Sequence, residues 1–123
     1  MTGSKLIDTS IWLDYFYKYK YKEIIDVSEI MFISVLSLFE IRKKMYKDKL
    51  DSSKIEALMT FLEKKSLLQP VSKEITELAA QLSFQHGIAA VDALIYATAL
   101  HYNAELITRD NDFRGLPNAR VLS

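Results

Sequence analysis

The chain has 123 residues, of which half are hydrophobic, and its 16 basic and 16 acidic side chains give a formal net charge of zero. This length can bury one core, and the hydrophobic content excludes a disordered protein, while the balanced charge argues against a protein that coats polyanions over its whole surface. Cysteine is absent and only His86 and His101 are present, which excludes disulfides, thiol nucleophiles and cysteine zinc sites and argues against histidine metal sites and Ser-His-Asp triads.

The first predicted strand, Lys5 to Asp8, ends in an acid, and Thr9 or Ser10 can cap the helix that follows. Five large apolar residues then share one side of that helix at helical spacing: Ile11, Trp12, Tyr15, Phe16 and Tyr19. Such aromatic density favours packing in and beside the core, and the alternative is that part of it forms a partner-binding surface.

A short helix at Lys22 to Val27 and a second strand at Ile30 to Ile33 precede a helix that begins at Ser34 or Ser37. Glu40 lies inside this helix between apolar neighbours. It is either an outward surface glutamate or a carboxylate aimed into a cleft. The basic run from Arg42 to Lys49 favours a solvated face, and contact with phosphates is the alternative.

The remaining elements alternate in the same way. They are a helix opened by Asp51 or by a Ser53–Glu56 capping box, a strand within Ser66 to Val71, a helix from Ser72 to Gly87, a helix at Asp92 that is apolar on every side and stops at Asn103, and strands at Glu105 to Thr108 and Ala119 to Leu122. No apolar run reaches transmembrane length and no signal peptide is visible, so we expect a cytoplasmic protein without a membrane partner.

Strands that alternate with helices predict an α/β domain with a parallel sheet and helices on both faces. Right-handed crossovers place all the strand ends at one edge. Asp8 and Asp110 follow strands at that edge, Asp92 starts a helix there, and Glu40 lies one or two turns into another. If the strands before Asp8 and Asp110 are neighbours, these four acids converge.

Each acid alone also fits a structural role, since Asp92 can be a first-turn acid and Asp110 and Asp112 can be turn formers. Convergence is what predicts function. Carboxylates without histidine or cysteine suit Mg²⁺ or Mn²⁺, and several unpaired carboxylates in a partly buried site are unfavourable without a cation. A metal-bound water can attack a phosphodiester, which predicts a metal-dependent nuclease.

Four segments carry a family resemblance: IDTSIW at 7–12, ISVLSLFEI at 33–41, VDALIYATAL at 91–100 and LITRDNDF at 106–113. Together they resemble the four acidic motifs of PIN domains. Their order and spacing resemble the small VapC-type toxins, the ribonuclease halves of type II toxin–antitoxin pairs. The resemblance covers nearly the whole chain.

The resemblance implies a set of catalytic, metal-binding acids, namely Asp8, Glu40, Asp92 and Asp110, with Asp112 as an accessory. Both Asp110 and Asp112 stay candidates for the fourth carboxylate. The resemblance also implies three hydroxyls that support ligands or water, those of Thr9, Ser10 and Thr108. The family further implies a five-stranded parallel sheet, Mg²⁺-dependent RNA cleavage in which Mn²⁺ can substitute, a homodimer and a small VapB-like antitoxin.

Because the net charge is zero, we expect RNA to be bound by a local positive field, with Arg109, Arg114 and Arg42 as candidate contacts. The main alternative function is a non-catalytic PIN-like interaction or RNA-binding module.

Overall fold

Five short parallel strands form the centre of the structure, a computed structural model that describes residues 3–123. They are β1 (Lys5–Ile7), β2 (Met31–Ser34), β3 (Ser66–Gln69), β4 (Glu105–Thr108) and β5 (Ala119–Val121). Their order across the sheet is β3-β2-β1-β4-β5, and every pairing is parallel. The predicted fold class and the five-stranded sheet are therefore confirmed.

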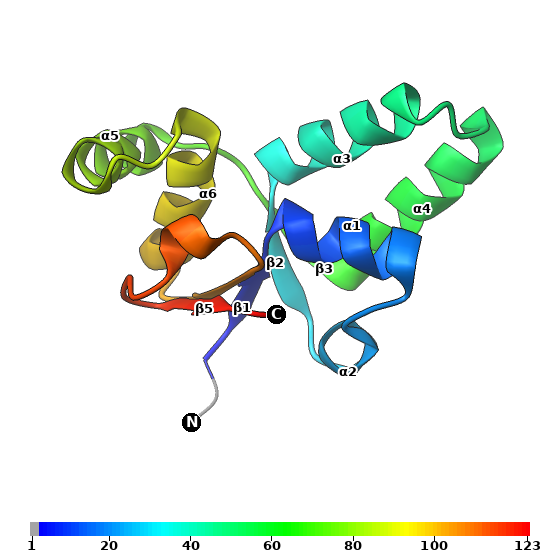
Figure 1. Ribbon diagram of the computed structural model, residues 1–123, viewed down its shortest axis with the longest axis horizontal. Coiled ribbons are helices and arrows are strands. Elements are labelled where there is room, and N and C mark those ends of the chain that lie inside the picture. Colours follow the sequence, from blue (N-terminus) through cyan, green and yellow to red (C-terminus); the bar gives the residue numbers. More distant parts are fainter. Residues whose placement is uncertain (1–2) are drawn as a thin grey trace.

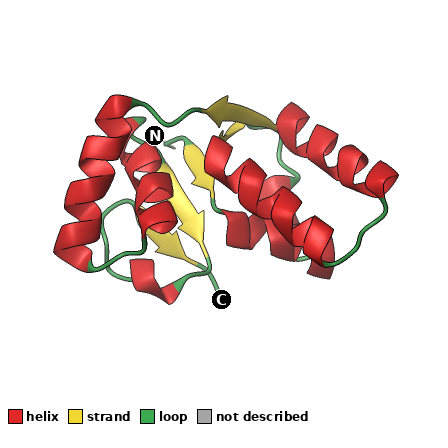
Figure 2. Cartoon of the chain, turned by 90° about the horizontal axis from the view of Figure 1, so that it is seen from above, coloured by secondary structure: helices red, strands yellow, loops and turns green. Residues whose placement is uncertain are grey.

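Helices cover both faces of this sheet. They are α1 (Thr9–Lys18), α2 (Lys22–Ile25), α3 (Val35–Lys47), α4 (Ser52–Lys65), α5 (Lys73–His86) and α6 (Ala90–His101), and a 3-10 turn, η1 (Asn111–Phe113), follows β4. Figure 1 shows α5 and α6 on one side of the sheet and α1, α3 and α4 on the other. The same two groups flank the strands in Figure 2.

Alternate residues of each central strand point into different cores. Leu6 and Leu106 pack with the residues of α5 and α6, whereas Ile7 and Ile107 pack with those of α1, α3 and α4. All four side chains are fully buried. Parallel strands buried on both faces read as continuous apolar runs, which is why these short segments could be recognised as strands.

Helix α6 is buried on nearly every side, as its apolar sequence predicted. Six of its residues are buried, and the Tyr96 ring packs edge-on against Phe113 of η1, with ring centroids 5.5 Å apart. The Tyr96 hydroxyl donates to the carbonyl of Pro117 at 2.5 Å. Because α6 is fixed by these contacts on the β5 side of the sheet, the position of its first turn is also fixed.

The start of α1 differs from the prediction, and at the start of α4 one of the two predicted alternatives, Asp51, is confirmed. Asp8, and neither Thr9 nor Ser10, is the N-cap of α1, since its carboxylate accepts from the Ser10 backbone N–H. The Ser53–Glu56 capping box is wrong: Asp51 occupies the N-cap position of α4, and Glu56 pairs with Arg42. The Ser53 hydroxyl donates to the Asp51 carboxylate instead of accepting from a backbone N–H, and Glu56 forms a bidentate pair with Arg42 of the neighbouring helix.

The order of the strands places a switch point at the centre of the sheet. From β1 the chain moves to β2 on one side and later returns to β4 on the other. Ligands of open α/β sheets bind beside the carboxyl ends of the strands at such a point. No helix within residues 3–123 is long and apolar enough to cross a membrane.

Candidate active site

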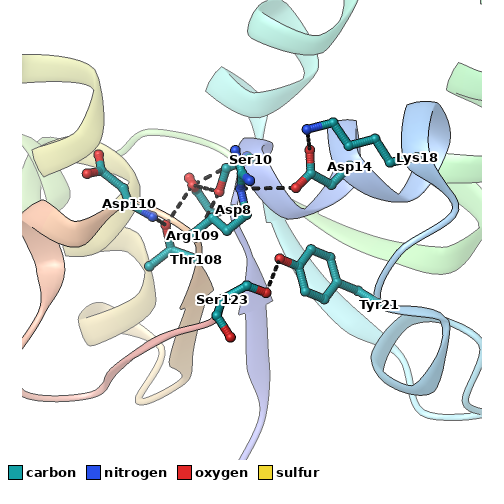
Figure 3. Close-up of polar contacts among 9 residues, drawn as sticks. All are labelled: Asp8, Ser10, Asp14, Lys18, Tyr21, Thr108, Arg109, Asp110 and Ser123. Atoms are coloured by element: carbon teal, nitrogen blue, oxygen red, sulfur yellow. Dashed lines mark hydrogen bonds and ion pairs between the residues drawn. The ribbon is translucent and has the colours of Figure 1, made fainter.

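Asp8 lies at the carboxyl end of β1 and is only 6% exposed. One of its oxygens, Oδ2, accepts hydrogen bonds from Ser10 Oγ at 2.7 Å, from Thr108 Oγ1 at 2.9 Å and from the Ser10 backbone N–H at 3.4 Å. These neutral donors fix the orientation of the carboxylate (Figure 3). Burial raises the pKa of Asp8, and the hydrogen bonds from Ser10 and Thr108 oppose that rise.

The same two hydroxyls also hold the loop after β4. Ser10 Oγ accepts from the Arg109 backbone N–H at 3.1 Å, and Thr108 Oγ1 accepts from the Asp110 N–H at 3.1 Å. Each hydroxyl therefore donates to Asp8 and accepts from the loop. Ser10 and Thr108 thus tie the first and fourth acidic segments together, and their role as supports for ligands or water stays a prediction.

Asp110 and Asp112 differ in their surroundings. Asp110 is half-buried and caps η1, because its Oδ1 accepts from the Asp112 N–H at 2.9 Å, whereas Asp112 is exposed. Asp110 is also linked to Asp8 through Thr108. This placement favours Asp110 over Asp112 as the fourth carboxylate.

Glu40 is half-buried on α3 and is held by a hydroxyl of α1. Thr9 Oγ1 lies 2.6 Å from Glu40 Oε1 and 2.8 Å from the Oγ of Ser37. Ser37, considered only as a possible helix start, is instead fully buried inside α3. The sequence offers one indication of this role for Ser37. It is a small polar residue three positions before Glu40 in an apolar stretch, and this spacing places both residues on one side of a helix.

Asp92 lies in the first turn of α6, three residues after the N-cap position, which Ala89 occupies. Its pKa is raised to about 6, first by burial and then by the charges of Asp8, Asp110, Glu40 and Asp112. The charges of the other four predicted acids thus all act on Asp92 at this edge of the sheet. Their effect on Asp92 indicates that the four segments bring their acids into one region, while the roles of these acids stay a prediction.

The five acids do not form a ready-made binding site for a metal ion. Within residues 3–123, no three acidic, histidine or cysteine side chains are grouped closely enough to hold a metal ion as they stand. The donors still fit a hard divalent cation, because they are carboxylate oxygens whose charges repel one another and which are supported by neutral hydroxyls.

The three candidate RNA-binding arginines all have partners in the protein. Arg109 Nε is 3.0 Å from Asp14 Oδ2, and Arg114 donates to the side chain of Asn111 at 2.7 Å. Arg42 forms a bidentate pair with Glu56 at 2.7 and 3.4 Å. Arg109 and Arg114 flank the acidic loop, whereas the charge of Arg42 is offset by its partner on α4.

Asp14 was missed in the sequence. It is 6% exposed, lies on α1 between aromatic residues, and contacts both Arg109 and Lys18. Its signal was an acid within the apolar run IWLDYF. Its contact with Arg109 ties the guanidinium of that arginine to α1 (Figure 3).

A groove of about 330 Å³ lies between α1 and α4, away from the acids. It is lined by Tyr15, Phe16, Tyr19, Lys22, Asp26, Ala57, Leu58 and Phe61. The Tyr15 and Phe61 rings are stacked with centroids 5.9 Å apart, and Tyr19 is 75% exposed. The aromatic side of α1 is therefore divided, since Ile11 and Trp12 are fully buried while the later residues form a surface.

The fold and the site together define an α/β domain with a carboxylate-rich site at the carboxyl edge of a parallel sheet. Residues 5–118 match the family model described as the PIN domain, and the chain belongs to the PIN domain family. This membership confirms the resemblance seen in the four acidic segments.

Solved structures of toxin–antitoxin proteins share the fold. A chain of a toxin–antitoxin complex from Klebsiella pneumoniae has 26% identity and a TM-score of 0.79, with 96% of this chain and 97% of that chain covered. VapBC2 from Rickettsia felis, bound to a DNA fragment of its promoter, has 22% identity and a TM-score of 0.76, with 96% of each chain covered. VapC20 of Mycobacterium tuberculosis, a toxin that cleaves the sarcin–ricin loop, has 16% identity and a TM-score of 0.71, with 93% and 95% covered. No curated protein sequence matches the chain.

Asp92→Asn should stabilise the metal-free protein. Because the pKa of Asp92 is raised to about 6 in the folded chain, from roughly 3.9 unfolded, its stabilising contribution is complete below about pH 4 and is lost as the pH rises through 6. In EDTA at pH 8 the variant should gain about 1 kcal/mol in the free energy of unfolding, after allowance for solvent screening and the lost helix-dipole interaction. The gain should vanish toward pH 4, which urea titrations at several pH values will measure.

Added Mg²⁺ should stabilise the wild type more than Asp92→Asn, because a ligand that binds only the native state stabilises it more when it binds more tightly. If the variant is less stable in EDTA at pH 8 and gains as much from Mg²⁺ as the wild type, Asp92 is a structural first-turn acid and its place in the site is wrong.

Proposed function

We propose that this chain is the toxin of a toxin–antitoxin pair, a metal-dependent endoribonuclease that acts in the cytoplasm and hydrolyses RNA phosphodiester bonds with a metal-activated water. One observation carries the proposal: carboxylates from four separate segments share one edge of the sheet, where burial and then the charges of the other acids raise the pKa of Asp92. Membership of the PIN domain family and the similarity to toxins that include an RNA-cleaving one support it.

The proposed cofactor is Mg²⁺, with Mn²⁺ as a substitute, and five side chains would hold it: Asp8, Glu40, Asp92, Asp110 and Asp112. When bound, the cation would activate water and stabilise the leaving oxygen. The protein supplies the orientation of its acids. Ser10 and Thr108 hold Asp8, and Thr9 holds Glu40, so two of the carboxylates are ordered before any ligand arrives.

Cysteine and histidine side chains offer few alternatives to a water nucleophile in this chain. The chain has no cysteine, and its two histidines are the last residues of α5 and α6. His101 follows Asp92 by nine residues along α6, which is roughly 13 Å at the rise of an α-helix. An imidazole at that distance does not reach a substrate held by the acids, so His101 is not the base that would activate an RNA 2′-hydroxyl.

Asp8→Asn should abolish RNA cleavage, because an amide at the most buried position removes a charge around which the cluster is built. We expect the wild type to cut total RNA with Mg²⁺ and not with EDTA, and the variant to be slower by about 100-fold or more. Glu63→Gln, which changes an exposed acid of α4, is the matched control and should cut normally. The products should carry 5′-phosphate and 3′-hydroxyl ends.

Products with a 2′,3′-cyclic phosphate would contradict the water mechanism. Binding of RNA without cleavage under any metal condition would instead favour the alternative, a non-catalytic PIN-like interaction or RNA-binding module.

Arg109 and Arg114 should contact the phosphates of RNA, since they flank the acidic loop in a chain of zero net charge. Replacing either arginine by glutamine should weaken the binding of RNA and lower the magnitude of the slope of log K against log salt by about 0.7.

The Arg42→Gln variant should show a smaller effect on RNA binding, because Glu56 offsets the charge of Arg42. Arg120→Gln on β5, paired with Glu105, is the control. Unchanged slopes for all three test variants would assign the basic residues to a solvated face.

The proposed partners are a second copy of the chain and a short VapB-like antitoxin that lies in the groove between α1 and α4. Tyr19→Ala and Phe61→Ala should weaken binding of the protein encoded by the neighbouring small reading frame by at least about tenfold, since both rings line the groove. Phe84→Ala is the matched control, an aromatic residue that is 91% exposed on α5. A chain that is monomeric at every concentration in light scattering, with no such reading frame beside its gene, would contradict the assignment.

A further inference from the structure

A buried serine, Ser37, is connected to the carboxylate of Glu40 through the hydroxyl of Thr9. Ser37 precedes Glu40 by three residues on α3, and its side chain is 0% exposed. Ser37 Oγ is 2.8 Å from Thr9 Oγ1, and Thr9 Oγ1 is 2.6 Å from Glu40 Oε1. Oxygen atoms from two helices thus form one chain of hydrogen bonds that ends at an acid of the site.

The number of protons sets the direction of this chain. A threonine hydroxyl has one proton and can donate one hydrogen bond, while an ionised carboxylate can only accept. At 2.6 Å from Glu40 Oε1, the proton of Thr9 is therefore donated to the carboxylate. The contact between Ser37 and Thr9 must then be donated by Ser37, which fills an acceptor position on the Thr9 oxygen.

We infer that Ser37 is a positioning residue: by donating to Thr9 Oγ1 it fixes the rotamer of Thr9 and, through Thr9, the orientation of the Glu40 carboxylate. This inference rests on the proposed metal site. A glutamate side chain has several rotatable bonds, and ordering it when a ligand binds costs conformational entropy. Ser37 and Thr9 meet that cost during folding, so removal of either hydroxyl should weaken the binding of a divalent cation.

A second buried serine supplies the comparison. Ser66 begins β3, opposite Met31 and so at the far end of the sheet from the acids, and it is 8% exposed. Within the described part of the chain its hydroxyl has no hydrogen-bond partner. A buried serine in this protein therefore does not always take part in a hydrogen-bond network. The hydrogen bond of Ser37 to Thr9 is specific to its position on α3, one turn before Glu40.

The test is the affinity of the full chain for Mn²⁺, measured by calorimetry. Ser37→Ala should bind Mn²⁺ about threefold to tenfold more weakly, which is the scale of one intramolecular hydrogen bond. The variant should fold, because alanine is the better helix former at an interior helix position. Ser66→Ala should bind Mn²⁺ as the wild type does, and melting curves in EDTA will report any change in folding separately.

A double-mutant cycle with Thr9 separates positioning from packing. Thr9→Val removes the hydroxyl at nearly constant shape, and in that background Ser37→Ala should cause no further loss of affinity, because Ser37 acts only through Thr9. Thr9→Ser keeps the hydroxyl and should keep the effect of Ser37→Ala.

The inference is overturned if Ser37→Ala binds Mn²⁺ with wild-type affinity, or if its loss is equal in the wild-type and Thr9→Val backgrounds. Both outcomes leave the proposed metal site intact. A wild-type chain that binds no Mn²⁺ would overturn the metal site and this inference together.

Discussion

The parallel pairing of β1 with β4 is the constraint on which the site depends. It sets Ile7 opposite Ile107, and so brings Asp8 beside Thr108, 100 residues later in the chain. The pairing holds because both strands are apolar on both faces and are buried between two helical layers. With β1 at the centre, α3 leads away from one neighbouring strand and α6 leads into the other, so the acids of both helices reach the same edge.

Neutral hydroxyls, rather than cations, orient the carboxylates of Asp8 and Glu40. A lysine or arginine beside Asp8 would lower its pKa and fill the place of a metal ion. Arg109 follows Thr108 directly, yet its guanidinium lies on Asp14, a buried acid of α1 that plays no part in the cluster. Ser10 and Thr108 orient Asp8 without neutralising it, which suits the divalent cation that we propose for the site.

The sequence predicted the elements and the acids because both depend on local pattern. Apolar runs marked the strands, and the order of elements required that the acids share an edge. What it could not predict depends on contacts between distant segments. The Ser53–Glu56 capping box failed because Arg42 of another helix competes for Glu56, and Ser37 and Asp14 were missed because their partners, Thr9 and Arg109, are brought near only by the fold. The choice between Asp110 and Asp112 likewise needed the link through Thr108.

The acids differ in the hydrogen bonds that support them, and the electrostatic repulsion therefore falls mainly on Asp92. Asp8 and Glu40 accept hydrogen bonds from hydroxyls, and Asp110 accepts one from the backbone of η1. For Asp92 the influences on its pKa are burial and four neighbouring carboxylates, all of which raise it. Helix α6 is fixed from behind by Tyr96 and Phe113, so Asp92 cannot withdraw from its neighbours without moving the core. The packing of α6 therefore holds an uncompensated charge against the cluster, and a cation is the ligand that would relieve it.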